Sequence, residues 1–139
     1  MYNTEILPRK QYEYLWRISW LAFCSGLFSV YRGHQWYIVV CQFGVWITSI
    51  NYWRKPDYSW RRYLDIIYVH YALMHQIYYA YYSQYKYHYY FLLSIGILYY
   101  QLGCYYYSKN NYEFSTICHG RLHIYANLAN MVLYCSDIL

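Results

Sequence analysis

Five stretches of mostly apolar residues follow one another along the chain, and short polar segments separate them. Each stretch approaches the ~20 residues that a helix needs to cross a ~30 Å hydrocarbon layer. None sustains the alternation of apolar and polar positions that a strand of a membrane barrel requires. The pattern predicts an all-α, polytopic membrane helix bundle of about five transmembrane helices, near residues 15–31, 36–53, 64–83, 87–107 and 117–138.

Tyrosine dominates the composition and changes how the hydropathy is interpreted. The chain has 26 tyrosines, and its mean hydropathy of −0.04 counts each of them as polar. A tyrosine ring is mostly apolar surface with one hydroxyl, and it suits the boundary between membrane and water. Only 12% of the residues are charged and 60% are hydrophobic. The composition therefore favours a single membrane domain over residues 1–139.

Basic residues lie at the ends of the apolar stretches. The formal net charge is +5, but this placement is typical of membrane topology, so we expect membrane lipids and no nucleic acid as partners. Residues 1–14 are polar enough to lie outside the bilayer. Two basic residues fall on the side of the 84–86 connection, Arg32 and Lys86, and eight fall on the other: Arg9, Lys10, Arg17, Arg54, Lys55, Arg61, Arg62 and Lys109. Lys and Arg mark the cytoplasmic side, which predicts a cytoplasmic N-terminus and cytoplasmic connections at 54–63 and 108–116.

The last apolar stretch is the most polar of the five. It contains His119 and His123, which are four residues apart and therefore lie on one face of a helix. Two such histidines can bind one metal ion. Polar groups in a membrane helix should face protein and not lipid. We therefore expect this helix to be the most enclosed, with partners for Asn127 and Asn130 on neighbouring helices or on another subunit.

Polar residues from three predicted helices fall at a similar depth. Ser49 is one turn from the end of the second helix, Asp65 opens the third, and His119 and His123 are near the start of the fifth. All of them would lie on the cytoplasmic side. His70, about 7 Å deeper than Asp65 at ~1.5 Å per residue, is the nearest further candidate. We expect these side chains to converge.

The spacing of these residues resembles the motif skeleton of the CREST superfamily, which includes the alkaline ceramidases and the progestin and adipoQ receptors. The matching elements are Ser49-x-x-Tyr52-Trp53, Arg62-x-x-Asp65 and His119-x-x-x-His123. The resemblance implies an intramembrane zinc site that activates water to cleave a lipid amide. It would make His119 and His123 zinc ligands, with Ser49 beside the metal and Asp65 positioning the water.

This chain departs from the family pattern at the third zinc ligand. Trp53 stands where the family has a histidine, and tryptophan does not bind zinc. His70 or Asp65 would have to substitute for it. Family members also have seven helices, whereas five are predicted here. A catalytic zinc needs three protein ligands and one open position.

Several other interpretations fit the same residues. The two histidines could hydrogen-bond within the bundle, Asp65 could oppose a helix dipole, and Ser49 could permit close packing. Haem ligation by His75 and His123 is a further alternative, although their depths differ. The strongest rival to an enzyme is a structural membrane subunit that packs against partner helices. The five cysteines show no paired spacing, so no disulfide framework is expected, and nothing specifies the organelle.

Overall fold

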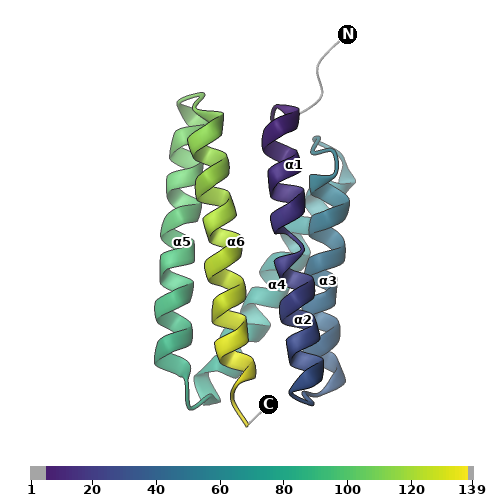
Figure 1. Ribbon diagram of the computed structural model, residues 1–139, viewed down its shortest axis with the longest axis vertical. Coiled ribbons are helices and arrows are strands. Elements are labelled where there is room, and N and C mark those ends of the chain that lie inside the picture. Colours follow the sequence, from purple (N-terminus) through teal and green to yellow (C-terminus); the bar gives the residue numbers. More distant parts are fainter. Residues whose placement is uncertain (1–5, 138–139) are drawn as a thin grey trace.

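Six helices run up and down between the two ends of the molecule in the computed structural model, which describes residues 6–137 (Figure 1). They are α1 (Arg9–Ile18), α2 (Leu21–Tyr31), α3 (Trp36–Trp53), α4 (Trp60–Tyr82), α5 (Lys86–Ser108) and α6 (Tyr112–Tyr134). Residues 6–137 contain no strand, so the prediction of an all-α bundle is confirmed. Within this range, no helix combines the length and the apolar character of a membrane span.

The single helix expected over residues 15–31 is interrupted by Ser19 and Trp20. The Ser19 hydroxyl donates to the backbone oxygen of Leu15 at 2.8 Å. The Trp20 N–H bonds to the oxygen of Arg17 at 3.2 Å, three residues back instead of four. Serine bonding to its own helix and a tightened turn both distort an α-helix. One apolar stretch therefore gives two segments, α1 and α2, that follow each other as one rod.

The other predicted boundaries differ from the structure where a helix begins with polar residues. The range of α3 agrees with the prediction, and α5 is one residue longer at each end. α4 begins at residue 60 instead of 64, and α6 begins at 112 instead of 117. At the start of α6, the Asn111 side chain accepts a hydrogen bond from the N–H of Phe114 at 3.2 Å, which caps the helix. α6 ends at Tyr134, so the predicted end of the last helix at 138 is too late.

The connections between helices alternate between two ends of the bundle. The start of α1, the α3–α4 connection and the α5–α6 connection share one end, here called the basic end (Figure 1). The α2–α3 and α4–α5 connections and the end of α6 lie at the far end (Figure 1). This arrangement agrees with the predicted grouping of the 54–63 and 108–116 connections opposite 84–86. Which end faces the cytoplasm stays a prediction.

The helices α5 and α6 pack against each other more extensively than any other pair of described helices. A Cβ atom added to Gly103 of α5 would lie 3.4 Å from the backbone oxygen of Ser115 in α6. The Ser115 hydroxyl donates to the backbone oxygen of Gly103 at 2.8 Å. Small residues of this kind let two helix backbones approach closely. α6 also packs against α1 and α2, while α4 runs at a slant behind the other helices (Figure 1).

The last helix is enclosed along its length, although α3 has a similar share of buried residues. Buried residues occur from the first turn of α6 to its last, and they include both Asn127 and Asn130. Each amide has partners on other helices, which are described below. Apolar side chains fill the bundle on either side of the amides. One cluster contains Ile38, Ala80, Tyr89, Leu93, Ala129, Leu133 and Tyr134, and a second, near the basic end, contains Leu7, Tyr12, Leu15, Tyr52 and Trp53.

Candidate functional site

Gln42 of α3 lies at the centre of a buried polar network. Its side chain is completely buried, in a helix without any charged residue. Its amide nitrogen donates to Ser25 Oγ of α2 at 2.6 Å and to Asn127 Oδ1 of α6 at 3.2 Å. The Ser25 hydroxyl in turn donates to Asn127 Oδ1 at 2.8 Å. The amide nitrogen of Gln42 therefore links α3 to both α2 and α6.

The amide oxygen of Gln42 joins a further helix to the network. It accepts hydrogen bonds from Gln76 Nε2 of α4 at 3.0 Å, Asn130 Nδ2 at 3.1 Å and the Tyr134 hydroxyl at 3.1 Å. All of these side chains are buried. We call the six residues the polar hub: Ser25, Gln42, Gln76, Asn127, Asn130 and Tyr134. The hub ties α2, α3, α4 and α6 together, and each of its side-chain polar atoms that is fully enclosed has a partner.

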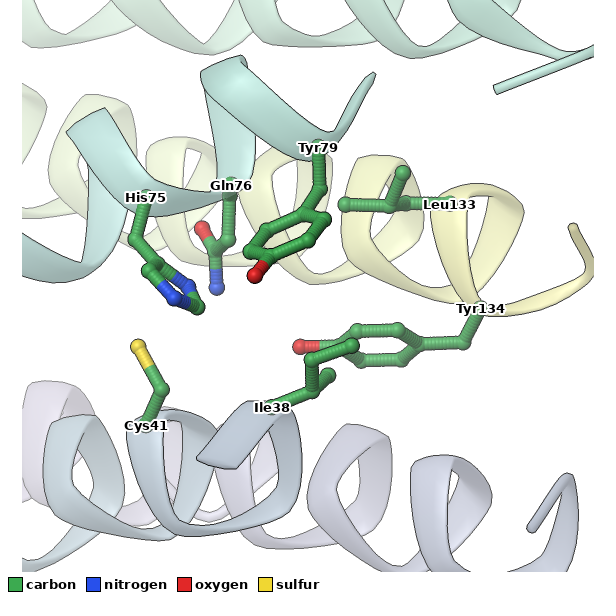
Figure 2. A pocket seen from close by; sticks show the side chains of 7 residues that line it. All are labelled: Ile38, Cys41, His75, Gln76, Tyr79, Leu133 and Tyr134. Atoms are coloured by element: carbon green, nitrogen blue, oxygen red, sulfur yellow. The ribbon is translucent and has the colours of Figure 1, made fainter. Parts of the chain in front are cut away.

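A small cavity of about 10 Å³ adjoins the polar hub. Figure 2 shows Gln76 and the hydroxyl of Tyr134 pointing toward it, together with the side chains of Cys41 and His75. A single water molecule needs roughly 10–15 Å³ and two or more polar partners. The space is thus limited to about one water and excludes an organic substrate. It has no room for a lipid amide.

At the basic end, Ser49 and Asp65 form a buried pair. The Ser49 hydroxyl donates to Asp65 Oδ1 at 2.9 Å, and both residues are almost fully enclosed. Ser49 is in the last part of α3, and Asp65 is in the first part of α4. The two helices are therefore linked by a hydrogen bond to a carboxyl group in a place from which water is excluded. The structure brings these two predicted site residues together.

The two histidines of α6 lie against each other and against Trp53. The ring centroids of His119 and His123 are 5.2 Å apart, and those of Trp53 and His119 are 5.0 Å apart. His123 Nε2 is buried and has no hydrogen-bond partner. We call Trp53, His119 and His123 the histidine cluster. Trp53 is one helical turn beyond Ser49 on α3, so this helix contributes one residue to the cluster and one to the Ser49–Asp65 pair.

The side chains present do not fit a catalytic zinc ion. Among residues 6–137, no group of three or more His, Cys, Asp or Glu side chains is placed to hold a metal. His119 and His123 supply two nitrogen ligands, and the residue that contacts His119 from α3 is Trp53, whose indole ring is not a zinc ligand. His70 is exposed on α4, where its Nδ1 lies 2.7 Å from the backbone oxygen of Ile66. It therefore does not join the histidine cluster.

Arg61 holds the α3–α4 turn, a role that the charge pattern did not reveal. Its guanidinium donates to the backbone oxygens of Asn51 and Lys55 at 3.1 and 2.7 Å, and it pairs with Asp57 at 2.9 Å. The Ser59 side chain also bonds to Asp57. Hydrogen bonds from Ser59 and Arg61 lower the pKa of the Asp57 carboxyl group. Arg61 is thus a structural residue of the turn as well as a basic flank.

The polar hub was also missed from the sequence. Two glutamines, Gln42 and Gln76, stand in long stretches without charge, and this was the available signal. A buried amide in such a stretch must find hydrogen-bond partners. The sequence cannot show that both amides meet at one point, because that depends on the rotation of four helices. Asn127 and Asn130 were the only members of the hub predicted to have interhelical partners.

The chain was compared with protein-family models, with curated proteins and with solved structures, and none of them matched it. The resemblance to the CREST superfamily accordingly stays a prediction from its short motifs.

Proposed function

We propose that this chain is a multi-pass membrane protein with a structural role, in which a polar hub fastens the helices and an apolar exterior contacts lipid and other membrane subunits. The observation that carries the proposal is the distribution of side chains. Amide and hydroxyl groups gather at the centre of the bundle, and large apolar side chains are exposed around it. This is the reverse of what a bundle surrounded by water requires.

The interior supports the proposal because of its hydrogen bonds. In hydrocarbon, an unpaired polar group costs several kcal/mol, so such groups turn inward and pair across helices. Gln42 does this with four side chains on α4 and α6 and a fifth, Ser25, on α2. The hub thus supplies the specific contacts that apolar side chains alone cannot supply in lipid.

The large apolar surface of the exterior also supports the proposed membrane location. Contiguous exposed apolar patches beyond a few hundred Å² are rare on monomers in water. The exposed apolar side chains come from every helix from α2 to α6, and they include Leu27, Val30, Val40, Ile47, Ile67, Met74, Phe91, Leu98, Leu102, Ile117 and Leu128. No Asp, Glu, Lys or Arg occurs in α2, in α3 or after the first residue of α5. A lipid environment would cover this surface.

Tyrosine explains how such helices can be embedded although their hydropathy is low. α4 and α5 have 23 residues each, or about 34 Å at ~1.5 Å per residue. Most of the tyrosines of α5 are in its first and last turns, and the apolar segment 91–98 lies between them. Aromatic belts at both ends of an apolar segment are typical of membrane helices. Basic residues then place the N-terminus in the cytoplasm, as the sequence predicts.

The hydrolase alternative has less support. It requires three zinc ligands and an open position for water, and the histidine cluster offers two ligands with an indole ring beside them. The Ser49–Asp65 pair and the unpartnered Nε2 of His123 are the observations in its favour. A structural role accounts for the pair as an interhelical link and needs no metal.

Alkaline extraction of membranes tests the proposed function. Membranes from cells that express the full chain are washed with carbonate at high pH, which releases peripheral proteins and leaves embedded ones in the pellet. We expect the chain to stay in the pellet and to dissolve only in detergent. Release into the carbonate supernatant as a folded, monodisperse protein would contradict the proposal.

A further inference from the structure

An open cavity of about 400 Å³ lies at the basic end, between α1 and the residue that follows α3. It is distinct from the polar hub and from the histidine cluster. Six residues line it: Arg9, Tyr12, Glu13, Trp16, Arg17 and Arg54. Its lining thus combines three guanidinium groups with two aromatic rings and one carboxylate. Tyr12 is also part of the apolar cluster near the basic end, and the arginines have so far been only basic flanks of the predicted topology.

The charge of this cavity is positive and only partly balanced. Arg9 pairs with Glu13 at 2.7 Å, on a surface where both side chains are well exposed. Arg17 and Arg54 are exposed, and neither forms an ion pair with any residue from 6 to 137. Three guanidinium groups and one carboxylate leave an excess of two positive charges. A guanidinium presents a planar fork of N–H groups that matches the oxygens of a phosphate.

Aromatic side chains continue from the cavity along the rod of α1 and α2. Trp16 lines the cavity and contacts Trp20, with ring centroids 5.9 Å apart. Trp20 contacts Trp46 of α3 at 5.1 Å, and Phe23 contacts Trp46 at 4.8 Å. We call Trp16, Trp20, Phe23 and Trp46 the aromatic strip. It leads from the basic end toward the middle of the bundle, with both Trp16 and Trp20 exposed.

From this juxtaposition we propose that the cavity binds the phosphate group of an anionic membrane lipid. The phosphate would lie between Arg17 and Arg54, and an acyl chain would lie along the aromatic strip. A free phosphate ion would use the cationic cavity alone and leave the strip without a role, so the lipid fits more of the surface. Arg17 is about two helical turns from the start of α1, so its long side chain can extend toward the headgroups while its stem lies against apolar neighbours. The inference rests on the proposed membrane location.

The test measures lipid binding by detergent-purified full-length protein. A short-chain phosphatidic acid is titrated in, and the change in total tryptophan fluorescence, to which Trp16 at the cavity wall contributes, reports binding. Parallel titrations use short-chain phosphatidylcholine, which carries no net charge, and inorganic phosphate, which has no acyl chain. We expect saturable binding of phosphatidic acid at concentrations where the other two compounds cause no change.

Two variants locate the site. The double variant Arg17→Gln/Arg54→Gln should weaken phosphatidic acid binding at least about tenfold, because two charges near the membrane surface are lost. Lys10→Gln is the matched control, since it removes a positive charge from the same helix at the same end but does not line the cavity. It should change the affinity less than about threefold. Unchanged unfolding temperatures show that both variants are folded.

Three outcomes would overturn the inference. Equal affinity for phosphatidylcholine would remove the role of charge, and equal affinity for inorganic phosphate would make the site a free-anion site. An equal loss of binding free energy per charge removed in Lys10→Gln and in the double variant would mean a diffuse surface effect. Because these titrations are carried out in detergent, they are independent of carbonate extraction. A chain that stays in the membrane pellet but shows no preference for phosphatidic acid would contradict this inference and leave the structural function intact.

Discussion

The polar hub and the histidine cluster are both enclosed by the bundle, yet their polar atoms are connected very differently. In the hub, the amide of Gln42 makes hydrogen bonds from both its nitrogen and its oxygen to three other helices. In the cluster, His119 and His123 make ring contacts, and the buried Nε2 of His123 has no partner. A fully bonded network fixes the positions of helices, whereas an incompletely bonded one contributes little to stability.

Because of this difference, we expect the polar hub to contribute more to stability than the His119–His123 motif. The spacing of the two histidines matches that of a pair of metal ligands. Gln42 belongs to no motif, but it fastens α3 to α2, α4 and α6. The comparison predicts that substitutions in the hub will destabilise the protein strongly and that substitutions in the histidine cluster will not.

The largest effect is expected for Gln42→Leu. This change leaves Gln76, Asn130 and the Tyr134 hydroxyl without their shared acceptor in a buried site. Each unsatisfied buried group costs about 1–3 kcal/mol, so the free energy of unfolding should fall by at least about 3 kcal/mol. Equilibrium unfolding in detergent micelles measures it. Gln101→Leu is the control, because Gln101 is exposed on α5, and it should stay within about 0.5 kcal/mol of the unchanged chain. A similar loss in both variants would remove the distinction between hub and surface.

An intermediate effect is expected for Ser49→Ala. The substitution removes the donor of the 2.9 Å hydrogen bond to the buried Asp65 carboxyl group. A buried polar group that loses its partner costs about 1–3 kcal/mol. Asp65→Asn retains an oxygen that can accept the same hydrogen bond, so it should cost less than Ser49→Ala. The same unfolding measurement compares them. If Asp65→Asn is the more damaging change, the carboxylate has a function beyond linking α3 and α4.

The smallest effect is expected for His123→Leu. Its Nε2 has no hydrogen bond to lose, and a leucine of similar size can fill the space beside His119. We expect a change in the free energy of unfolding below about 1 kcal/mol, because replacing an unpaired buried polar group by an apolar one is nearly neutral.

Zinc titration tests whether the histidine cluster binds a metal ion. Added Zn²⁺ should leave the unfolding temperature of the unchanged chain as it is, since two nitrogen ligands are too few for a structural or catalytic site. A ligand that binds only the folded state raises that temperature. A rise with zinc that disappears in His123→Leu would contradict the account and favour the hydrolase.

The sequence predicted the helices well because the apolar stretches are long and clearly separated. It predicted the range of α3 correctly, and it identified Ser49 and Asp65 as side chains that converge. It misjudged the starts of α4 and α6, since Arg61, Arg62 and Glu113 lie inside those helices but look like connections. The break at Ser19 depends on a serine bonding to its own backbone, which composition does not show.

Which candidate residues converge was harder to predict than the helices themselves. Depth along a helix can be counted from the sequence, so Ser49 and Asp65 were correctly placed toward one end, and His119 contacts Trp53 at the end of α3. His123 was placed less well, because it lies at the middle of α6. The direction in which a side chain faces cannot be predicted in the same way, because a helix that is apolar on every face has no polar side to mark its outside. His70 therefore lies on the outside of α4, although its depth agrees with that of a ligand.

The central claim, that lipid surrounds a bundle held by the polar hub, is tested most directly at Cys24. This thiol is exposed near the middle of the α1–α2 rod, while Cys135 is exposed just beyond α6 at the far end. The protein is reconstituted in liposomes with a water-soluble maleimide on both sides of the membrane, and peptide mass spectrometry follows each thiol. The account predicts that Cys135 reacts at least about tenfold faster than Cys24, because the reaction needs the thiolate and water, and that the difference disappears in SDS. Equal rates in intact liposomes would contradict it.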